Sequence, residues 1–148
     1  MIHSLVIVGS GALATYYAYK WSENYTVSVL GSWEESINAI NATARKKEMH
    51  KLIATSDWKK IKEPDLVVWL TKTHKNEHSL KKYVQLEWKC PILILQNGIG
   101  QEEVFNNILG IKQNILRGVT SQGVRLINPG SVLNTGNGEV FVEEKVSD

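Results

Sequence analysis

The ten residues Leu5–Ala14, with the sequence LVIVGSGALA, decide the fold of this chain. They join a continuous aliphatic run, Leu5–Val8, to the pattern Gly-x-Gly-x-x-Ala at Gly9–Ala14. Such a run is typical of a strand that is covered on both faces of a parallel sheet. Ala12–Trp21 then carries apolar side chains at helical spacing, and Thr26–Leu30 is rich in the β-branched residues of a strand. The stretch therefore predicts a strand, a tight turn, a helix and a second strand.

In this context the glycine turn is predicted to bind the pyrophosphate of a nicotinamide dinucleotide. Gly9 permits the tight turn, Gly11 leaves space for the pyrophosphate against the backbone, and the small Ala14 lets the helix pack close to the strand. The amides at the start of the helix then face the phosphates. A bare structural turn is the alternative, and the strand before and the helix after favour binding. The predicted pyrophosphate-binding residues are Gly9, Ser10, Gly11, Ala12, Leu13 and Ala14.

The rest of the chain alternates short apolar runs with helical patterns. Further strands are predicted at residues 51–55, 65–70, 92–95 and 115–120, and further helices from Ser32, at 76–86 and at 101–109. Ser32-Trp33-Glu34-Glu35 has the form of a capping box, in which Ser32 caps the helix and Glu35 reaches back to it. Turn residues surround two short runs, Val132–Asn134 and Glu139–Val142, which predicts an antiparallel hairpin at a sheet edge. We therefore expect one α/β domain over residues 1–148, with a Rossmann-type, doubly wound, mostly parallel sheet and a C-terminal antiparallel hairpin.

The composition restricts the classes of partner and location. The chain has 148 residues, 43% of them hydrophobic and 22% charged, and a net charge of +2 with scattered lysines, so neither nucleic acid nor a membrane surface is predicted as a partner. The single cysteine, Cys90, precedes an apolar run and is expected to be a structural thiol in a reducing compartment. No apolar run approaches the ~20 residues of a membrane span, which favours a cytoplasmic protein. His74 and His78 have helical spacing but no third ligand, so no metal site is predicted.

Ligands of doubly wound sheets bind at the carboxyl ends of the strands, and three loops there carry informative residues. The second strand ends at Leu30-Gly31-Ser32, without the acid typical of an NAD site and without an arginine. The Ser32 hydroxyl can donate to a 2′-phosphate or only cap the helix, so NADP is slightly favoured and NAD remains open. Lys72 and Asn97 follow the strands at 66–70 and 92–95, and we expect both to contact cofactor or substrate. A solvated lysine and a helix-capping asparagine are the alternatives.

Several motifs together resemble the ketopantoate reductase (2-dehydropantoate 2-reductase) family. The matching segments, which cover nearly the whole chain in the family's order, are GSGALA at 9–14, LTKT at 70–73, QNGIGQEE at 96–103, RGVTSQGVR at 117–125 and NPGSVLNTGNG at 128–138. The resemblance implies reduction of a 2-keto acid, ketopantoate, by NADPH on the route to pantothenate. It also implies that Lys72 and Asn97 lie near the nicotinamide ribose and the substrate, and that the backbone around Val124 contacts the nicotinamide end. A lysine or amide there would stabilise the negative charge that develops on the keto oxygen.

The sequence departs from the family pattern in ways that bear on activity. Ser32 stands where the family has an arginine for the 2′-phosphate. The resemblance also implies a helical C-terminal domain that supplies the catalytic lysine and a substrate-binding glutamate. This sequence ends at Asp148 and contains no candidate for that domain, so no catalytic residue is predicted in it. Three functions stay open: the cofactor-binding half of a 2-keto acid reductase, truncated or completed by a separate chain; a stand-alone nucleotide-binding or sensing module; and an interaction domain that forms a homodimer.

Overall fold

The computed structural model describes residues 1–95 and 101–144. The first three elements, β1 (Ser4–Val8), α1 (Ala12–Trp21) and β2 (Thr26–Leu30), are those that the sequence predicts. The remaining elements are α2 (Glu34–Lys46), β3 (Leu52–Thr55), η1 (Trp58–Lys60), β4 (Leu66–Trp69), η2 (Thr73–Lys75), α3 (Asn76–Val84), β5 (Ile92–Ile94), α4 (Gln101–Leu109), β6 (Ile115–Thr120), β7 (Gly123–Asn128), β8 (Ser131–Gly136) and β9 (Val140–Val142).

The main sheet has seven strands in the order β3-β2-β1-β4-β5-β6-β9. The first six are parallel, and β9 is antiparallel to β6. The strand order therefore reverses between β1 and β4, which is the switch point of a doubly wound sheet. This topology confirms the predicted Rossmann-type fold.

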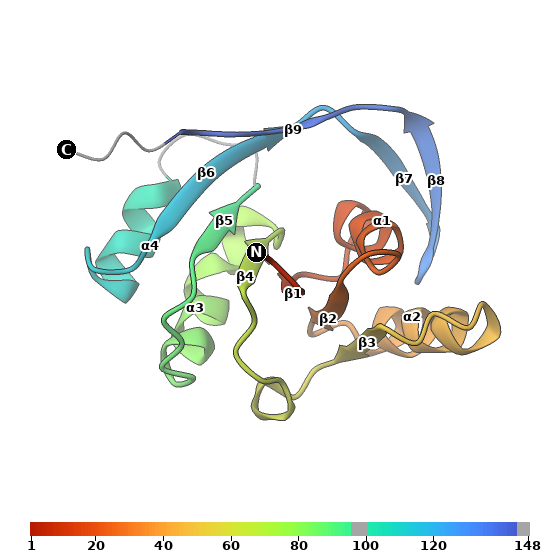
Figure 1. Ribbon diagram of the computed structural model, residues 1–148, viewed down its shortest axis with the longest axis horizontal. Helices are drawn as coiled ribbons and strands as arrows, with labels where there is room; N and C mark the ends of the chain where they lie inside the picture. The colour runs from red at the N-terminus through yellow and green to blue at the C-terminus, as the bar shows by residue number, and fades with distance from the viewer. Residues whose placement is uncertain (96–100, 145–148) are drawn as a thin grey trace.

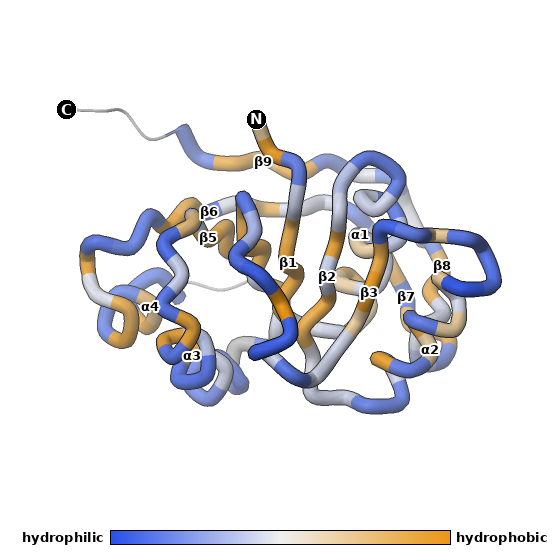
Figure 2. The backbone as a smooth tube through the Cα atoms, turned by 60° about the horizontal axis from the view of Figure 1, so that its bottom comes forward, coloured by the Kyte–Doolittle hydropathy of each residue, from blue (hydrophilic) through white to orange (hydrophobic). Residues whose placement is uncertain are grey.

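Side chains on the two faces of the sheet enter two separate cores. On β1, Leu5 and Ile7 pack into the core beneath α1 and α2, whereas Val6 and Val8 pack into the core beneath α3 and α4. Figure 1 shows the two helix pairs on opposite sides of the sheet, and Figure 2 shows the central strands as hydrophobic segments between hydrophilic loops. Burial on both faces is why the strand runs are continuously aliphatic rather than alternating.

The predicted C-terminal hairpin exists, but one of its two strands differs from the prediction. β7 pairs with β8 in a separate antiparallel ribbon, and β9 leaves that ribbon to pair with β6. The prediction that Val132–Asn134 pairs with Glu139–Val142 is therefore wrong. Gly130, with a φ of +74°, turns the chain back at once after β7, so β8 meets β7 first. The segment after Gly136 then pairs with the open edge of β6.

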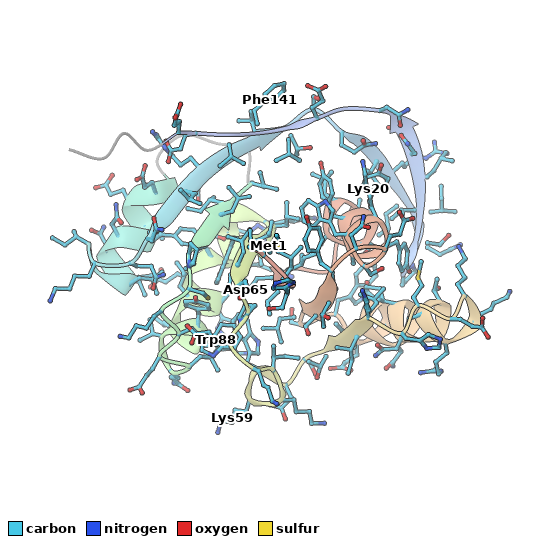
Figure 3. All side chains as sticks on the ribbon, in the orientation of Figure 1. Met1, Lys20, Lys59, Asp65, Trp88 and Phe141 are labelled. Carbon is cyan, nitrogen blue, oxygen red and sulfur yellow. The ribbon has the colours of Figure 1, made fainter. Side chains whose placement is uncertain are left out.

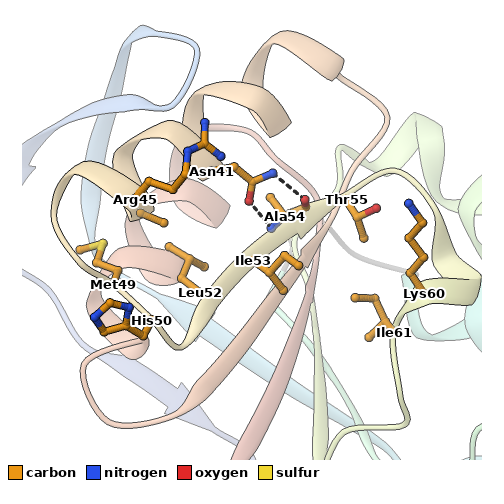
Figure 4. Close-up of a pocket in the computed structure, with 11 residues that line it drawn as sticks. Asn41, Arg45, Met49, His50, Leu52, Ile53, Ala54, Thr55, Lys60 and Ile61 are labelled. Carbon is orange, nitrogen blue, oxygen red and sulfur yellow. Dashed lines mark hydrogen bonds between the residues drawn. The ribbon is translucent and has the colours of Figure 1, made fainter.

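A side chain protects the outer edge of the sheet. The Asn41 side chain donates to the Ala54 carbonyl and accepts from the Ala54 amide, both at 2.8 Å (Figure 4). These bonds occupy backbone groups of edge strand β3 that could otherwise pair with another chain. A pocket of about 560 Å³ lies alongside, between α2, β3 and Ile61. None of the predicted site residues lines this pocket.

Gly9 joins the sheet to the first loop at a point where a side chain does not fit. Its φ is +125°, and a Cβ there would lie 3.0 Å from the carbonyl carbon and oxygen of Leu70. The Gly9 amide donates to the Leu30 carbonyl at 2.8 Å, and the Leu70 amide donates to the Val8 carbonyl at 2.8 Å. Gly9 is thus held between the carboxyl ends of β2 and β4.

We expect Gly9→Ala to lower the free energy of unfolding by about 1–3 kcal/mol, because alanine is strained at this φ and its Cβ meets backbone. Gly136→Ala is the matched control, since a Cβ at Gly136 has no heavy atom within 4 Å. Urea denaturation of both variants measures the difference. Equal stabilities of the two variants would contradict the proposed role of Gly9.

Candidate functional site

The glycine turn forms an open cradle at the start of α1. Gly11 is the N-cap residue, and a Cβ built on it would meet no heavy atom within 4 Å. The first backbone bond of α1 runs from the Thr15 amide to the Gly11 carbonyl at 3.0 Å, so the amides of Ala12 and Leu13 have no acceptor within the helix. No side chain caps this end, and no acidic residue lies in the first turn. Open space before unpaired amides is the arrangement that binds an anion.

The small third residue of the motif has the role that the sequence predicts. Ala14 is 1% exposed and belongs to the same core as Leu5 and Ile7 of β1. A larger side chain there would push α1 away from the sheet and move the amides at its start. The close packing of helix on strand therefore places the cradle directly over the end of β1.

The second loop is packed against the first. The Ser10 carbonyl accepts hydrogen bonds from Ser36 Oγ at 2.8 Å and from Thr15 Oγ1 at 3.4 Å. A Cβ on Gly31 would lie only 2.6 Å from Ser10 Oγ, so the backbone after β2 touches the glycine turn. These contacts fix the β2–α2 turn relative to the cradle.

The expected capping box at Ser32 is wrong. The N-cap residue of α2 is Trp33, in an extended conformation, and no side-chain hydrogen bond caps the helix. Ser32 lies one residue earlier and is exposed, so its hydroxyl stands at the carboxyl end of β2 without a capping role. Glu34 and Glu35 are in the first turn of α2, where carboxylates interact favourably with the helix dipole.

Of the three later site residues, Lys72 lies in the loop that starts beside the glycine turn. Lys72 is exposed and lies two residues after Leu70, whose backbone is close to Gly9. Its carbonyl accepts from the Lys75 amide at 2.9 Å. Val124 lies in β7, opposite Asn134 of the hairpin, and the described contacts do not place it in the cradle. Asn97 lies outside the described residues.

A buried polar network supports the loop that carries Lys72. The Asn76 side chain is 1% exposed and accepts from Trp69 Nε1 at 3.1 Å and from Thr71 Oγ1 at 2.7 Å. Its amide nitrogen donates to Gln101 Oε1 at 2.7 Å. The network therefore joins the end of β4, the start of α3 and the start of α4. Sequence analysis placed Asn76 only at a helix start, because nothing local indicates that it is buried.

The other reactive side chains considered in the sequence are Cys90, His74 and His78, and none of them belongs to the cradle. Cys90 is buried, and this burial raises the pKa of its thiol, which lies 3.9 Å from the Tyr83 hydroxyl. His74 and His78 are exposed, and residues 1–95 and 101–144 hold no group of three side chains able to bind a metal. Within the same ranges, no helix is both long and apolar enough to cross a membrane.

Comparison with known proteins agrees with this geometry. The family model "Ketopantoate reductase PanE/ApbA" matches residues 5–146. The chain belongs to this family. The match includes the glycine cradle, the Lys72 loop and the hairpin, so it covers both the sheet and the C-terminal ribbon.

This chain matches about half of the length of each of its individual relatives. A 2-dehydropantoate 2-reductase of Pyrococcus abyssi is 24% identical over 142 residues, which are 93% of this chain and 46% of the relative. The crystal structure of a putative 2-dehydropantoate 2-reductase from Enterococcus faecalis aligns with a TM-score of 0.77 and 25% identity, over 94% of this chain and 48% of that one. A complex of D-mandelate dehydrogenase with NADH aligns with a TM-score of 0.75 and 25% identity, over 94% and 46%.

We expect Asn76→Ala to lower the free energy of unfolding by about 1–3 kcal/mol, because it removes the acceptor of Trp69 Nε1 and Thr71 Oγ1 and the donor to Gln101. Asn107→Ala, at an exposed position of α4, is the control and should change stability by less than about 0.5 kcal/mol. Urea denaturation compares the two. A loss no larger than the control's would show that the network does not stabilise the loop.

Proposed function

We propose that this chain is the cofactor-binding half of a reductase that uses NADPH to reduce a 2-keto acid, ketopantoate or a close analogue, to the 2-hydroxy acid. The observation that carries the proposal is the open space at Gly11 before the uncapped start of α1. It occurs at the switch point of the sheet, where dinucleotides bind in Rossmann-type folds. Membership of the ketopantoate reductase family and the similarity to a complex of D-mandelate dehydrogenase with NADH support it.

The residues of the cradle fit the expected group. The backbone of Gly9–Ala14 would hold the pyrophosphate, because its free amides and open space complement two phosphates. When bound, the dinucleotide supplies the hydride for the keto carbon. Lys72 would stabilise the negative charge on the keto oxygen, and Asn97 and the backbone at Val124 would orient the nicotinamide end. The proton for that oxygen is expected from the helical half, which the family resemblance implies.

The β2–α2 turn bears on the choice between NADP and NAD. Ser32 is exposed at the end of β2 and its hydroxyl can donate to a 2′-phosphate, which supports NADP. Glu34 and Glu35 follow in the first turn of α2, and two carboxylates near a 2′-phosphate would repel it. The proposed preference for NADP is therefore a weak one, and NAD remains an alternative.

The two alternative functions use other properties of the same chain. A nucleotide-binding or sensing module would bind the dinucleotide and perform no chemistry. An interaction domain would use an apolar surface. Val119 and Phe141 are paired across β6 and β9 and are 61% and 58% exposed. Figure 3 shows Phe141 on the outer side of β9. A second copy of the chain or a helical half would cover such a pair. A cytoplasmic location, without nucleic-acid or membrane partners, stays a prediction.

The central test is Gly11→Glu. The new side chain enters open space, so we expect the fold to persist, while its volume and charge exclude the pyrophosphate and weaken NADPH binding at least about 100-fold. Gly136→Glu adds the same charge at another open position and should bind like the wild type. Calorimetry measures binding, and NADPH oxidation with ketopantoate tests whether the purified chain catalyses the reaction without a helical half. Equal NADPH affinity of Gly11→Glu and wild type would overturn the assignment of the cradle.

The variant Ser32→Arg tests the proposed preference for NADP over NAD. A guanidinium pairs with phosphate through two charge-assisted hydrogen bonds, so we expect the ratio of NADPH to NADH affinity to rise about tenfold. Ser32→Ala is the control for loss of the hydroxyl and should lower that ratio slightly. Titrations with both cofactors measure the ratios. If arginine strengthens NADH binding equally, position 32 does not face the 2′-phosphate.

A further inference from the structure

One tryptophan differs from the others in its surroundings. The sequence contains five tryptophans, and Trp21, Trp58, Trp69 and Trp88 each lie against another aromatic ring. Trp21, for example, stacks on Tyr17 with ring centroids 4.3 Å apart. Trp33 belongs to none of the ring pairs in the described part of the chain and is 37% exposed. A large aromatic side chain that the core does not use is a candidate for ligand contact.

The position of Trp33 places it at the ligand-binding end of the sheet. It follows the carboxyl end of β2 by three residues and is the N-cap residue of α2. Its carbonyl accepts from the Ile37 amide at 3.0 Å, which fixes its backbone to the helix. Ser36, three residues later, donates to the Ser10 carbonyl of the glycine turn. The first turn of α2, which Trp33 precedes as N-cap, is therefore bonded to the glycine turn.

We propose that Trp33 is the stacking residue for the adenine of the bound dinucleotide. This inference rests on the proposed function. When the pyrophosphate lies on the first turn, the adenosine ribose reaches the end of the second strand, beside residues 31–33. An indole stacks on any base face, and such contacts contribute measurably to nucleotide binding.

Stacking also fits the charges of this turn. Gly31, Ser32 and Trp33 carry no charge, and the carboxylates of Glu34 and Glu35 follow in the helix. An adenine ring is neutral, so this surface attracts it through the indole and not through ion pairing. The expected ligand is therefore an adenine nucleotide with a 5′-diphosphate. ADP-ribose is the minimal probe for it, and nicotinamide mononucleotide is the control because it lacks adenine.

The experiment is a titration of Trp33 variants with ADP-ribose and nicotinamide mononucleotide. We expect Trp33→Ala to bind ADP-ribose about tenfold more weakly and nicotinamide mononucleotide as the wild type does. Trp33→Phe keeps a ring and should lose less than Trp33→Ala. Ile53→Ala, which truncates another exposed apolar side chain, is the control and should bind ADP-ribose unchanged. Quenching of tryptophan fluorescence by ADP-ribose should be strong in the wild type and largely absent in Trp33→Phe.

The outcomes separate this inference from the proposed function. If the wild type binds ADP-ribose and Trp33→Ala binds it equally tightly, Trp33 does not stack and the inference is overturned, while the proposed function stands. If the wild type binds neither ADP-ribose nor NADPH, the proposed function itself fails. Should Trp33→Ala not fold, the fluorescence comparison decides: unchanged quenching in Trp33→Phe would overturn the role of Trp33.

Discussion

The structure depends on a backbone contact at the switch point of the sheet. Gly9 has a φ of +125° and lies so close to Leu70 that a Cβ would be 3.0 Å from its carbonyl. This contact lets the chain leave β1 and turn immediately into α1 while β4 packs alongside. The carboxyl ends of β1, β2 and β4 lie side by side here because the three strands pair in parallel, and three loops of the candidate site start there.

The two motif glycines serve different purposes, and the difference separates fold from function. Gly9 is required by its φ and by its closeness to backbone, whereas a Cβ on Gly11 would touch nothing within 4 Å. The fold alone would tolerate a side chain at Gly11, and the proposed pyrophosphate would occupy the space there. The bonds to the Ser10 carbonyl keep this space and the β2–α2 turn in one fixed arrangement.

A second constraint holds the loop on the other side of the switch point. Asn76 joins Trp69 and Thr71 to Gln101, so the loop carrying Lys72 and the start of α4 are coupled through one buried amide. The chain belongs to the ketopantoate reductase family, which supports the proposal that this edge of the sheet binds the cofactor. The chain spans about half the length of its relatives, and the reaction is accordingly proposed for the complete assembly.

The sequence by itself determined β1, α1, β2 and the glycine turn, because aliphatic runs, helical spacing and glycine act over a few neighbouring residues. It also indicated the family and the position of Lys72 in the loop after β4. Only the tertiary structure decided which strands pair at the C-terminus, because the open edge of β6 competes for β9 across some twenty residues of chain. The burial of Asn76, the bonds of Asn41 to the β3 edge and the exposure of Trp33 likewise depend on segments distant in sequence. Local sequence patterns cannot show which distant residues a side chain contacts in the folded protein.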